Sequence, residues 1–556
     1  MKQLFSTLSA LLISISSTAQ WAQKGDTFNG FLSGDACGQG ASLNYDGSIV
    51  AIGYPGNDQA GTDAGQVRVY QWDGSQWNTL GSPIYGQTPN EFLGDEAVLD
   101  SVGHTLIVGC QNSTSSLDSG VIKVYDWNGN SWIQRGNSIS GSSTSNFGAF
   151  ISASNDGNTF IVGSPDYPDY YGLVTVYEWN STQWVQKGDS LTGANKHDDL
   201  YKVDINSDGN VIIVGAEGDD TQQNAAGKVE VFEWNGASWQ PKGTPIYGDL
   251  NSDNDGSDVA INASGSIIAL SGQGRDHFGT DRGYVRVFEW NGTAWVQKGI
   301  NLYGAGQGDE YGIQLSLNDL GNKLSIASVK HDNSKGHIQV FEWDGTEWVK
   351  LGNDIDGENA GDRFGVIQKL SNDGYSLVAT SLEAAPFGAK SGHSKVFSLC
   401  PLAAVDIDGV TLTSQDPFAS YQWIDCNNGN AILPGDTNQV FTATQNGSYA
   451  VIVSQYGCTD TSDCVVVNSV GVGEENLSPK LQVFPNPNTG TFHVEFPITE
   501  ALRTVELLDV SGRKIPFHYT RTDNSYEFHT DASKGTYVIQ VLLDSGKTHR
   551  IPIVIH

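Results

Sequence analysis

Residues 251–258 carry a run of side chains that could bind a metal ion. The run reads Asn251-Ser252-Asp253-Asn254-Asp255-Gly256-Ser257-Asp258. Its oxygen-bearing side chains alternate and its glycine permits a bend, which suits Ca²⁺ because this ion takes several oxygen ligands in a flexible geometry. The sequence therefore predicts a candidate Ca²⁺ site with ligands Asn251, Asp253, Asp255 and Asp258. The alternative is an ordinary loop, since the same residue types also build turns.

A second acidic run, Asp204-Ile205-Asn206-Ser207-Asp208-Gly209, has three oxygen side chains at alternate positions. The matching stretch later in the chain, Ala260-Ile261-Asn262-Ala263-Ser264-Gly265, lacks the carboxylates. A tight turn can tolerate that difference and a metal site cannot. We therefore favour a hairpin turn over a metal site for residues 204–209.

Three further stretches, residues 53–65, 164–172 and 272–283, combine carboxylates with tyrosine or histidine. Such side chains can stack on a ligand and hydrogen-bond to it. We predict that they contribute to a binding face, with a merely solvated acidic surface as the alternative. The candidate binding residues are Tyr54, Asp58, Asp63, Asp166, Tyr167, Asp169, Tyr170, Asp276, His277 and Asp281.

Signatures of catalysis are missing from the sequence. Gly-x-Ser-x-Gly, His-Glu-x-x-His and phosphate-loop motifs do not occur. His331, His337 and His393 have no metal-ligand spacing, so we expect solvated histidines. Residues 154–160 only loosely resemble the Asp-box of sialidases, without its spacing and tryptophan. The prediction is a protein that is not an enzyme.

The charge balance limits the partners. Lys and Arg number 30 against 63 Asp and Glu, a formal net charge of -33. Such a field repels phosphates, which argues against nucleic acids and anionic bilayers. Cations, basic proteins and neutral glycans remain compatible with it.

The N-terminus predicts export. Residues 1–19 read as a signal peptide, with Lys2 before an apolar stretch and Ser17-Thr18-Ala19 as the cleavage site. No later apolar run is long enough for a membrane helix, so we expect no membrane insertion. The six cysteines favour disulfides in an exported chain, and Cys458 could bridge Cys464 across a hairpin.

An internal repeat indicates the fold. A block close to Val/Ile-x-Val-aromatic-x-Trp-Asn/Asp-Gly-x-x-Trp recurs every 52–56 residues, with a second tryptophan five residues after the first. This period fits one four-stranded blade of a β-propeller. A turn glycine recurs seven times, at Gly47, Gly103, Gly157, Gly209, Gly265, Gly321 and Gly374. Residues 20–399 are therefore predicted to form a seven-bladed β-propeller in an all-β chain.

The two ends of the repeat explain why six tryptophan pairs accompany seven turns. Gln20-Trp21-Ala22-Gln23-Lys24-Gly25 matches Gln183-Trp184-Val185-Gln186-Lys187-Gly188, which is the outer strand of a blade. The last repeat stops at Leu399 without that strand. We predict that the N-terminal strand completes the seventh blade and removes its open edge.

Dipeptides such as Asp73-Gly74 predict the second hairpin of each blade. A two-residue loop would pair Trp72 with Ser75 and Tyr70 with Trp77, placing the aromatic rings on one sheet face. Packing between blades is the favoured role of these rings, and a carbohydrate-stacking platform is the alternative.

Antiparallel strand order places the turns between strands 1 and 2 and between strands 3 and 4 at one end of every blade. The long acidic loops between strands 2 and 3 lie at the other end. Variable loops on a rigid scaffold are where binding usually resides. We therefore expect any ligand at the long-loop end.

The repeat resembles integrin-like FG-GAP propellers. Phe147-Gly148, Tyr311-Gly312 and Phe364-Gly365 open first strands, and Val162-Gly163-Ser164-Pro165 lies near the Gly-Ala-Pro position of that family. The family's Ca²⁺ loop, Asp-x-Asp-x-Asp-Gly-x-x-Asp, is not intact in any first hairpin.

Residues 400–469 resemble an immunoglobulin-like module. Tyr421-Gln422-Trp423 would lie on a central strand and Tyr449-Ala450-Val451-Ile452-Val453 on a later one. The Cys-Trp-Cys spacing of antibody domains is not kept. Residues 470–480 read as a linker.

The C-terminal segment, residues 481–556, resembles the type A sorting domain of the type IX secretion system of Bacteroidetes. Three motifs occur in order: Val483-Phe484-Pro485-Asn486-Pro487-Asn488-Thr489-Gly490, Leu508-Asp509-Val510-Ser511-Gly512-Arg513-Lys514 and Gly535-Thr536-Tyr537-Val538-Ile539-Gln540-Val541. The resemblance implies a β-sandwich, contact with the type IX machinery and delivery outside the cell or to its outer surface.

Together these observations predict a secreted or surface-displayed binding protein with a glycan or protein ligand. The first alternative is a propeller hydrolase or lyase acting on polysaccharide through carboxylates at the long-loop end. The second is a structural surface or matrix component.

Overall fold

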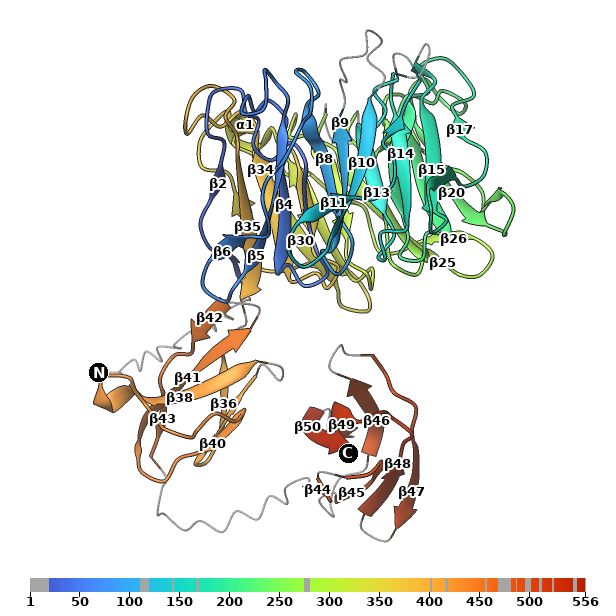
Figure 1. The fold of residues 1–556 in the computed structure, drawn as a ribbon. Coiled ribbons are helices and arrows are strands. Elements are labelled where there is room, and N and C mark those ends of the chain that lie inside the picture. The colour runs from blue at the N-terminus through green and yellow to red at the C-terminus, as the bar shows by residue number, and fades with distance from the viewer. Residues whose placement is uncertain are drawn as a thin grey trace, which may run out of the picture. The chain divides into compact units, whose positions relative to one another are not determined.

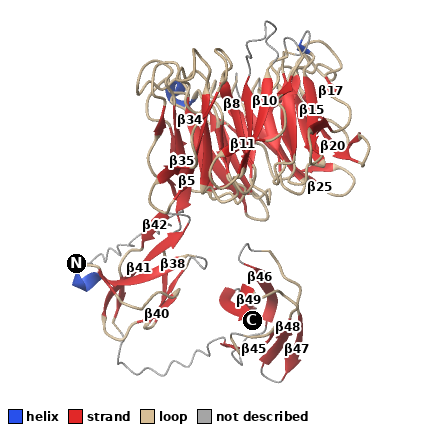
Figure 2. Cartoon of the chain, in the orientation of Figure 1, coloured by secondary structure: helices blue, strands red, loops and turns tan. Residues whose placement is uncertain are grey.

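The structure is a computed structural model, and it is all-β (Figures 1 and 2). It describes residues 20–110, 120–142, 145–166, 170–274, 281–400, 403–415, 419–455, 458–468, 482–486, 488–495, 502–509, 513–522, 525–543 and 548–555. The helical elements of this described part include α1 (His331–Ser334) and the 3-10 turn η2 (Cys426–Asn428). The predicted signal peptide, residues 1–19, and the predicted linker, residues 470–480, lie outside the described residues.

The chain divides into two compact units. One holds the sequence up to Val405 together with Ala419–Trp423 and Ala450–Asp463. The other holds Asp406–Phe418, Ile424–Tyr449 and Cys464–His556. The domain boundaries inferred from the sequence stay predictions.

Residues 20–400 form five-stranded antiparallel sheets, seven in the described part of the chain. In each sheet, alternating apolar residues build a first, a second and a third strand that lie side by side. The first strands are β3 (Ala41–Leu43), β8 (Leu93–Leu99), β13 (Phe150–Ala153), β18 (Leu200–Ile205), β23 (Asp255–Ile261), β28 (Tyr311–Leu317) and β33 (Gln368–Leu370).

The second strands are fully buried because a neighbouring sheet covers each face. They are β4 (Ile49–Tyr54), β9 (Thr105–Cys110), β14 (Thr159–Ser164), β19 (Val211–Ala216), β24 (Ile267–Gly272), β29 (Lys323–Ser328) and β34 (Ser376–Ser381). The third strands are β5 (Gln66–Trp72), β10 (Val121–Trp127), β15 (Leu173–Trp179), β20 (Lys228–Trp234), β25 (Tyr284–Trp290), β30 (His337–Trp343) and β35 (His393–Cys400).

Each third strand pairs with two short outer segments. The fourth strands are β6 (Trp77–Thr79), β11 (Trp132–Gln134), β16 (Trp184–Gln186), β21 (Trp239–Pro241), β26 (Trp295–Gln297) and β31 (Trp348–Lys350), with β1 (Gln20–Gln23) in this role beside β35. The fifth strands are β7 (Ile84–Tyr85), β12 (Ile139–Ser140), β17 (Leu191–Thr192), β22 (Ile246–Tyr247), β27 (Leu302–Tyr303), β32 (Ile355–Asp356) and β2 (Phe28–Asn29).

The N-terminal strand β1 pairs with β35, as expected from the sequence. Trp21 lies opposite Leu399, and its indole N–H donates to the Leu351 carbonyl oxygen at 3.0 Å. Six more indoles, those of Trp77, Trp132, Trp184, Trp239, Trp295 and Trp348, donate in the same way to a carbonyl of the preceding sheet, at 2.7–3.1 Å. These bonds favour packing over a sugar-stacking platform, since the indole N–H groups already hold the sheets together.

The sheets close into a ring, which we call the sheet ring (residues 20–400). Each first strand contacts the next, and β33 contacts β3. The turns after the first strands are also joined by backbone N–H to carbonyl bonds of 2.8–3.1 Å: Tyr45 to Ser101, Ser101 to Asn155, Asn155 to Ser207, Ser207 to Ala263, Ala263 to Asp319, Asp319 to Asn372, and Asp373 to Tyr45. The connections gather at two opposite ends of the strands (Figure 1).

The predicted register of the second hairpin is wrong by two residues. Trp72 lies opposite Trp77, and the loop comprises Asp73 to Gln76. Asp73 is the reason: its Oδ1 accepts the backbone N–H groups of Ser75 and Gln76 at 2.8 and 2.9 Å. These side-chain hydrogen bonds stabilise a four-residue loop in place of the predicted two-residue loop. The tryptophans still share one face, because a shift of two residues preserves side-chain direction.

The predicted bridge between Cys458 and Cys464 is also wrong, because Cys464 is bonded to Cys426. Cys400 is disulfide-bonded as well. Cys37 and Cys110 are free and buried in the sheet ring, and burial raises the pKa of the Cys37 thiol to about 12. Cysteine number alone therefore overstates the number of disulfides.

Residues 405–467 form two smaller sheets. One has the order β36 (Val405–Asp408), β37 (Thr411–Ser414), β40 (Val440–Thr442). The other has the order β39 (Ala431–Ile432), β38 (Ser420–Asp425), β41 (Gly447–Gln455), β42 (Cys458–Thr461), with β43 (Val465–Val467) also paired to β41. Trp423 on β38 is fully buried.

Residues 482–555 form two sheets around one core. The first has the order β44 (Gln482–Phe484), β45 (Thr491–Glu495), β48 (Ser525–His529), β47 (His518–Thr522), and the second β46 (Leu502–Asp509), β49 (Gly535–Leu543), β50 (Thr548–Ile555). Phe492, Phe528, Ile539 and Ile553 pack in the core.

The closing strand should carry a large share of the stability of the sheet ring. Replacing Trp21 by Ala removes a 5% exposed side chain and its bond to Leu351, so we expect a loss of about 3–5 kcal/mol in the free energy of unfolding. Guanidinium chloride unfolding measures it. Ile300→Ala, at a 78% exposed position, is the control and should shift stability by less than about 0.5 kcal/mol. Equal effects of the two substitutions would contradict closure by β1.

Candidate functional site

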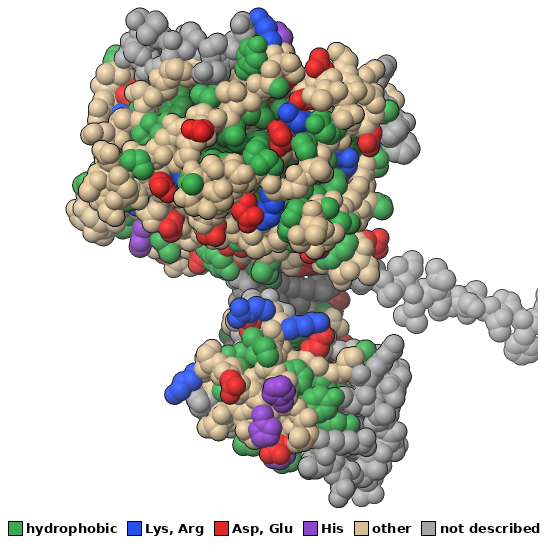
Figure 3. Space-filling model, turned by 90° about the vertical axis from the view of Figure 1, so that its right-hand side faces the viewer, with side chains coloured by type: hydrophobic (Ala, Val, Ile, Leu, Met, Phe, Trp, Pro, Cys, Tyr) green, Lys and Arg blue, Asp and Glu red, His purple; other side chains and the backbone are tan. Residues whose placement is uncertain are grey.

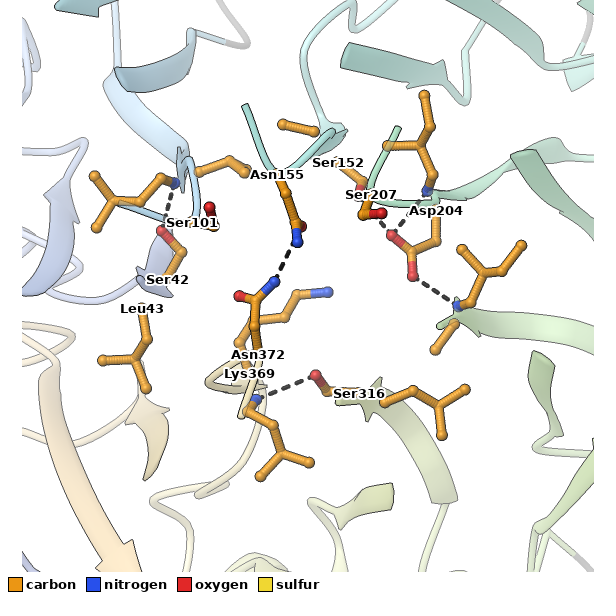
Figure 4. Close-up of a pocket in the computed structure, with 18 of the residues that line it drawn as sticks. Ser42, Leu43, Ser101, Ser152, Asn155, Asp204, Ser207, Ser316, Lys369 and Asn372 are labelled. Atoms are coloured by element: carbon orange, nitrogen blue, oxygen red, sulfur yellow. Dashed lines mark hydrogen bonds between the residues drawn. The ribbon is translucent and has the colours of Figure 1, made fainter. Parts of the chain in front are cut away.

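A cavity of about 140 Å³ lies where the first strands of all the sheets meet. Its wall includes Ser42, Glu96, Ser152, Asp204, Ser316 and Lys369, one from each of six first strands, and Figure 4 shows several of these side chains converging. Polar side chains reach this place because successive first-strand residues alternate between the cavity and the neighbouring strand. We call it the central cavity.

Charged side chains surround the central cavity. Asp204 accepts the Ser152 hydroxyl at 2.5 Å and the Ile261 N–H at 2.8 Å. Asp258 accepts the Leu315 N–H at 2.7 Å and lies 4.0 Å from the Lys202 ammonium. Each carboxylate therefore bonds to the first strand of the next sheet, which ties the wall together.

Burial controls the protonation of these groups. It raises the pKa of Glu96 to about 8, with the positive charge of Lys369 acting in the opposite direction. Burial also raises the pKa values of Asp204 and Asp258, again opposed by nearby lysines. Glu96 therefore keeps its proton at neutral pH, and the cavity avoids accumulating negative charge.

The tight-turn end of the central cavity is closed by three side chains. Asn155 donates to Asp319 at 3.0 Å, and Asn372 donates to Asp319 at 2.8 Å and to Asn155 at 3.1 Å. The Asn155–Asn372 contact is drawn in Figure 4. All three lie on turns after first strands, so the closed face is the one with short connections.

A second pocket, of about 360 Å³, lies between the last and the first sheet at the long-loop end. We call it the aromatic pocket. Its lining is Thr27, Phe28, Asn29, Gly30, Phe31, Tyr54, Arg68, Tyr70 and Phe387. Phe31 and Phe387 are 45% and 59% exposed, whereas Tyr54 is buried with its hydroxyl 3.4 Å from that of Tyr70. A wall of exposed ring faces marks a binding surface more often than a structural one.

The structure distributes the predicted binding residues over several places. Tyr54 enters the aromatic pocket. Asp58 accepts the Asp63 N–H at 2.8 Å within its own loop, and Asp166 accepts Asn146. Tyr170 stacks on His197 with ring centroids 5.5 Å apart. Asp281 is exposed. Tyr167, Asp169, Asp276 and His277 lie outside the described residues.

The predicted Ca²⁺ ligands have protein partners. Asp253 accepts the Leu250 N–H at 2.7 Å, Asp255 accepts the Tyr284 hydroxyl at 2.6 Å and pairs with Arg286, and Asn251 is exposed. Asp258 accepts the Leu315 N–H at 2.7 Å and lies 4.0 Å from the Lys202 ammonium. Among the described residues no group of three or more His, Cys, Asp or Glu side chains is placed to hold a metal. Calcium binding stays a prediction, and it would require Asp255 to leave Arg286.

The expectation of solvated histidines is wrong for two of the three. His337 and His393 are 3% and 5% exposed, because they begin third strands that the loops cover. His337 stacks on His331 at 4.0 Å between ring centroids. Burial lowers the pKa of both His337 and His393.

Phe31, Arg68 and Phe387 of the aromatic pocket were missed in the sequence analysis, as were Glu96 and Lys369 of the central cavity. Arg68 follows the repeat and so reads as an ordinary strand residue. A signal did exist for Phe31: the loop residue after Gly30 is aromatic there, but Gln87, Ser142, Ala194, Asp249, Ala305 and Glu358 follow the matching glycines.

The C-terminal motif has a structural role in its own sheets. Asn486 donates to the Pro552 carbonyl at 2.9 Å and accepts the Val554 N–H at 2.8 Å. Asn488 accepts the Gly490 N–H at 2.8 Å, where Gly490 has a φ of 93°. Asp509 accepts the Arg513 side chain at 3.1 Å. The residues that define the motif thus fix the turn and the edge of this β-sandwich.

Comparison with known families identifies this part of the chain. Residues 482–555 match the family described as the secretion system C-terminal sorting domain. This domain marks proteins that type IX secretion releases or anchors at the cell surface, and the chain is therefore a secreted or surface-anchored protein of that route. No curated protein matches the sequence.

Solved structures resemble the chain only distantly. A 6-phosphogluconolactonase-like protein of Bacteroides fragilis is 12% identical, with 58% of this chain and 84% of that chain covered and a TM-score of 0.40. Hydrazine synthase of Kuenenia stuttgartiensis is 14% identical, with 64% and 93% covered and a TM-score of 0.41. A similar lactonase-like protein of Bacteroides uniformis is 13% identical, with 58% and 85% covered and a TM-score of 0.41. At these values the resemblances carry no argument about activity.

The distribution of charged side chains on the surface is consistent with the negative net charge of the sequence. In the face drawn in Figure 3, acidic side chains are scattered over the surface without a large basic patch. Within the described residues no helix is long and apolar enough to span a bilayer.

The protonation of Glu96 should make stability depend on pH. The folded protein holds this proton up to a pH of about 8, whereas an unfolded chain releases it near pH 4.3. Between these values the folded state binds the extra proton, so the stabilising contribution of Glu96 falls as pH rises and is lost above about pH 8. We expect Glu96→Gln to gain stability relative to the wild type between pH 5 and pH 8 in denaturant titrations. Exposed Glu347→Gln is the control, and a pH-independent difference for Glu96→Gln would refute the assignment.

Deleting residues 482–556 should abolish delivery to the cell surface or medium, because the sorting domain lies there. Fractionation of the producing cell with an antibody against the sheet ring measures this. Asn486→Ala is a milder variant that removes the contacts to Pro552 and Val554 and should lower export. Undiminished export of the deletion variant would refute the sorting role.

Proposed function

We propose that the protein is a non-enzymatic, adhesin-like binding protein whose sheet ring is a seven-bladed, FG-GAP-like β-propeller that recognises a glycan at the cell exterior. The closed set of contacts between first strands and the seven indole bonds between sheets support the propeller. A scaffold closed in this way is rigid, which suits loops that bind.

The observation that carries the proposal is the aromatic pocket. Exposed rings of Phe31 and Phe387 stand beside the buried Tyr54 and the partly buried Tyr70 at the end predicted to bind ligands. Sugar rings are apolar on their faces and polar at their edges, so they fit ring faces with hydroxyls close by. The pocket volume of about 360 Å³ lies near the lower end of the range for small-molecule sites.

The rival function, a polysaccharide hydrolase or lyase, finds its best support in the central cavity. Glu96 with its raised pKa could serve as a general acid beside the carboxylate of Asp204. The volume of the central cavity, about 140 Å³, is small for a sugar residue. Its tight-turn end is closed by Asn155, Asp319 and Asn372. We therefore favour a structural role for this charge cluster.

Residues 400–469 serve in this proposal as an immunoglobulin-like spacer between the binding head and the sorting domain. Two small sheets, the fully buried Trp423 and the Cys426–Cys464 disulfide support that assignment. The disulfide suits a chain that works in an oxidising exterior.

The test is a glycan array probed with the full-length secreted chain, with Ca²⁺ and with chelator. We expect hits that Phe31→Ala weakens about tenfold or more, because the exposed ring is lost, and no cleavage of the bound glycans. Ile300→Ala is the control. Binding that chelator and Asp253→Asn both weaken would support the calcium site. Cleavage would favour the enzyme, and an array without hits would refute glycan recognition in favour of a protein partner or a structural role.

A further inference from the structure

The third strand of each sheet has one position that often carries a positive charge. It is the third residue of the strand, where Arg68, Lys123, Thr175, Glu230, Arg286, Gln339 and Lys395 lie in chain order. The four cations at this position each contact the loop that leads in from the preceding sheet. The partners of the four cations can therefore be compared directly.

Three of the four cations are neutralised by a carboxylate. Lys123 pairs with Glu91, Lys395 pairs with Glu358, and Arg286 pairs with Asp255 and lies 3.9 Å from Asp249. Asp249 and Glu358 occupy the same place in their loops, directly after Gly248 and Gly357. A buried cation needs such a partner, since an uncompensated charge is costly to desolvate.

Arg68 is the exception. The residue directly after the matching loop glycine, Gly30, is Phe31 in place of a carboxylate. The Phe31 ring lies under the guanidinium at 4.4 Å from its centroid, and the Arg68 Nε donates to Gln66 at 3.1 Å. Within the described residues Arg68 makes no ion pair. The Arg68 side chain also lines the aromatic pocket.

We propose that the aromatic pocket binds an anionic pyranose, a sugar ring carrying one carboxylate or sulfate, and that Arg68 supplies the charge that recognises it. This inference rests on the proposed glycan-binding function. A planar guanidinium can bind either anion through two parallel hydrogen bonds. Phe31 orients Arg68 by stacking, and the exposed face of Phe387 is left for the sugar.

The net charge of the chain further restricts the class of ligand that can bind. At -33 the protein repels a densely anionic polymer along its whole length, although repulsion beyond about 8 Å is screened at physiological salt. A single anionic ring in an otherwise neutral glycan contacts Arg68 directly and experiences little repulsion from the rest of the protein. The ligand class is therefore a mostly neutral glycan with an isolated acidic sugar.

The test compares one neutral oligosaccharide that contains a single uronic acid with its methyl ester and with a sulfated analogue, by calorimetry on the full-length chain. We expect the acid to bind about ten- to a hundredfold more tightly than the ester, the gain typical of a hydrogen bond to a charged group. The sulfated analogue shows which anion is preferred.

Arg68→Gln should remove the preference for the acid while leaving ester binding in place. Phe31→Glu should also remove the preference for the acid, because it restores the carboxylate found at Asp249 and Glu358. It should weaken binding of the ester as well, because the exposed ring is lost. Lys350→Gln, a partly exposed cation paired with Asp354, is the matched charge control, and unfolding midpoints confirm that each variant folds.

The outcomes separate the inference from the proposed function. Equal binding of acid and ester by the wild type, or a preference that survives Arg68→Gln, overturns the role of Arg68 while glycan recognition stands. Binding of a peptide carboxylate in place of every sugar tested overturns the glycan class itself. Tight binding of a densely sulfated polymer overturns the restriction to isolated acidic rings.

Discussion

The antiparallel pairing of β1 with β35 is the constraint on which the rest of the sheet ring depends. It joins Gln20 to Cys400, so nearly the whole ring must be formed before it can close. Closing so long a loop costs conformational entropy, although that cost grows only slowly with length. The gain is cooperative: once β1 is seated, Trp21 meets Leu351, the last sheet gains its outer strand, and the circle of turn-to-turn hydrogen bonds is complete.

The same closure creates the aromatic pocket. The chain leaves β1 through β2, which pairs with β35, and then supplies Gly30 and Phe31 to the wall shared with Phe387 and Arg68. Residues more than three hundred positions apart thus face one ligand-sized space. Stability and the candidate binding site are linked, because a ring that opened between its first and last sheets would lose both.

Repetition made much of the fold predictable from the sequence. The tryptophan spacing indicated the sheets, and the match between the segments around Trp21 and Trp184 indicated the closing strand. The predicted hairpin register was wrong because the Asp73 side chain accepts hydrogen bonds from backbone N–H groups of the turn. The dipeptide Asp73-Gly74 does not reveal this local competition. The prediction of the Cys464 partner was wrong for a different reason, because disulfide pairing depends on which strands become neighbours in the fold.

The candidate sites were harder to predict because they arise where first strands or neighbouring sheets meet. Glu96, Asp204 and Lys369 come from strands that read as ordinary alternating segments, and only the ring brings their side chains into one cavity. Tyr54 was found because tyrosine at the end of a strand is visible in the sequence. Arg68 was not, since arginine at that position is unremarkable until its missing carboxylate is noticed.

Departures from the repeat therefore carry more functional information here than the repeat itself. Asp249 and Glu358 serve the structure by neutralising a cation, and the chain could have used the same solution at the first sheet. Phe31 in that place leaves the partly buried Arg68 without a carboxylate partner at the rim of a pocket. The departure at Phe31 is therefore the reason for proposing recognition at the junction of the first and last sheets, and not in the charged central cavity.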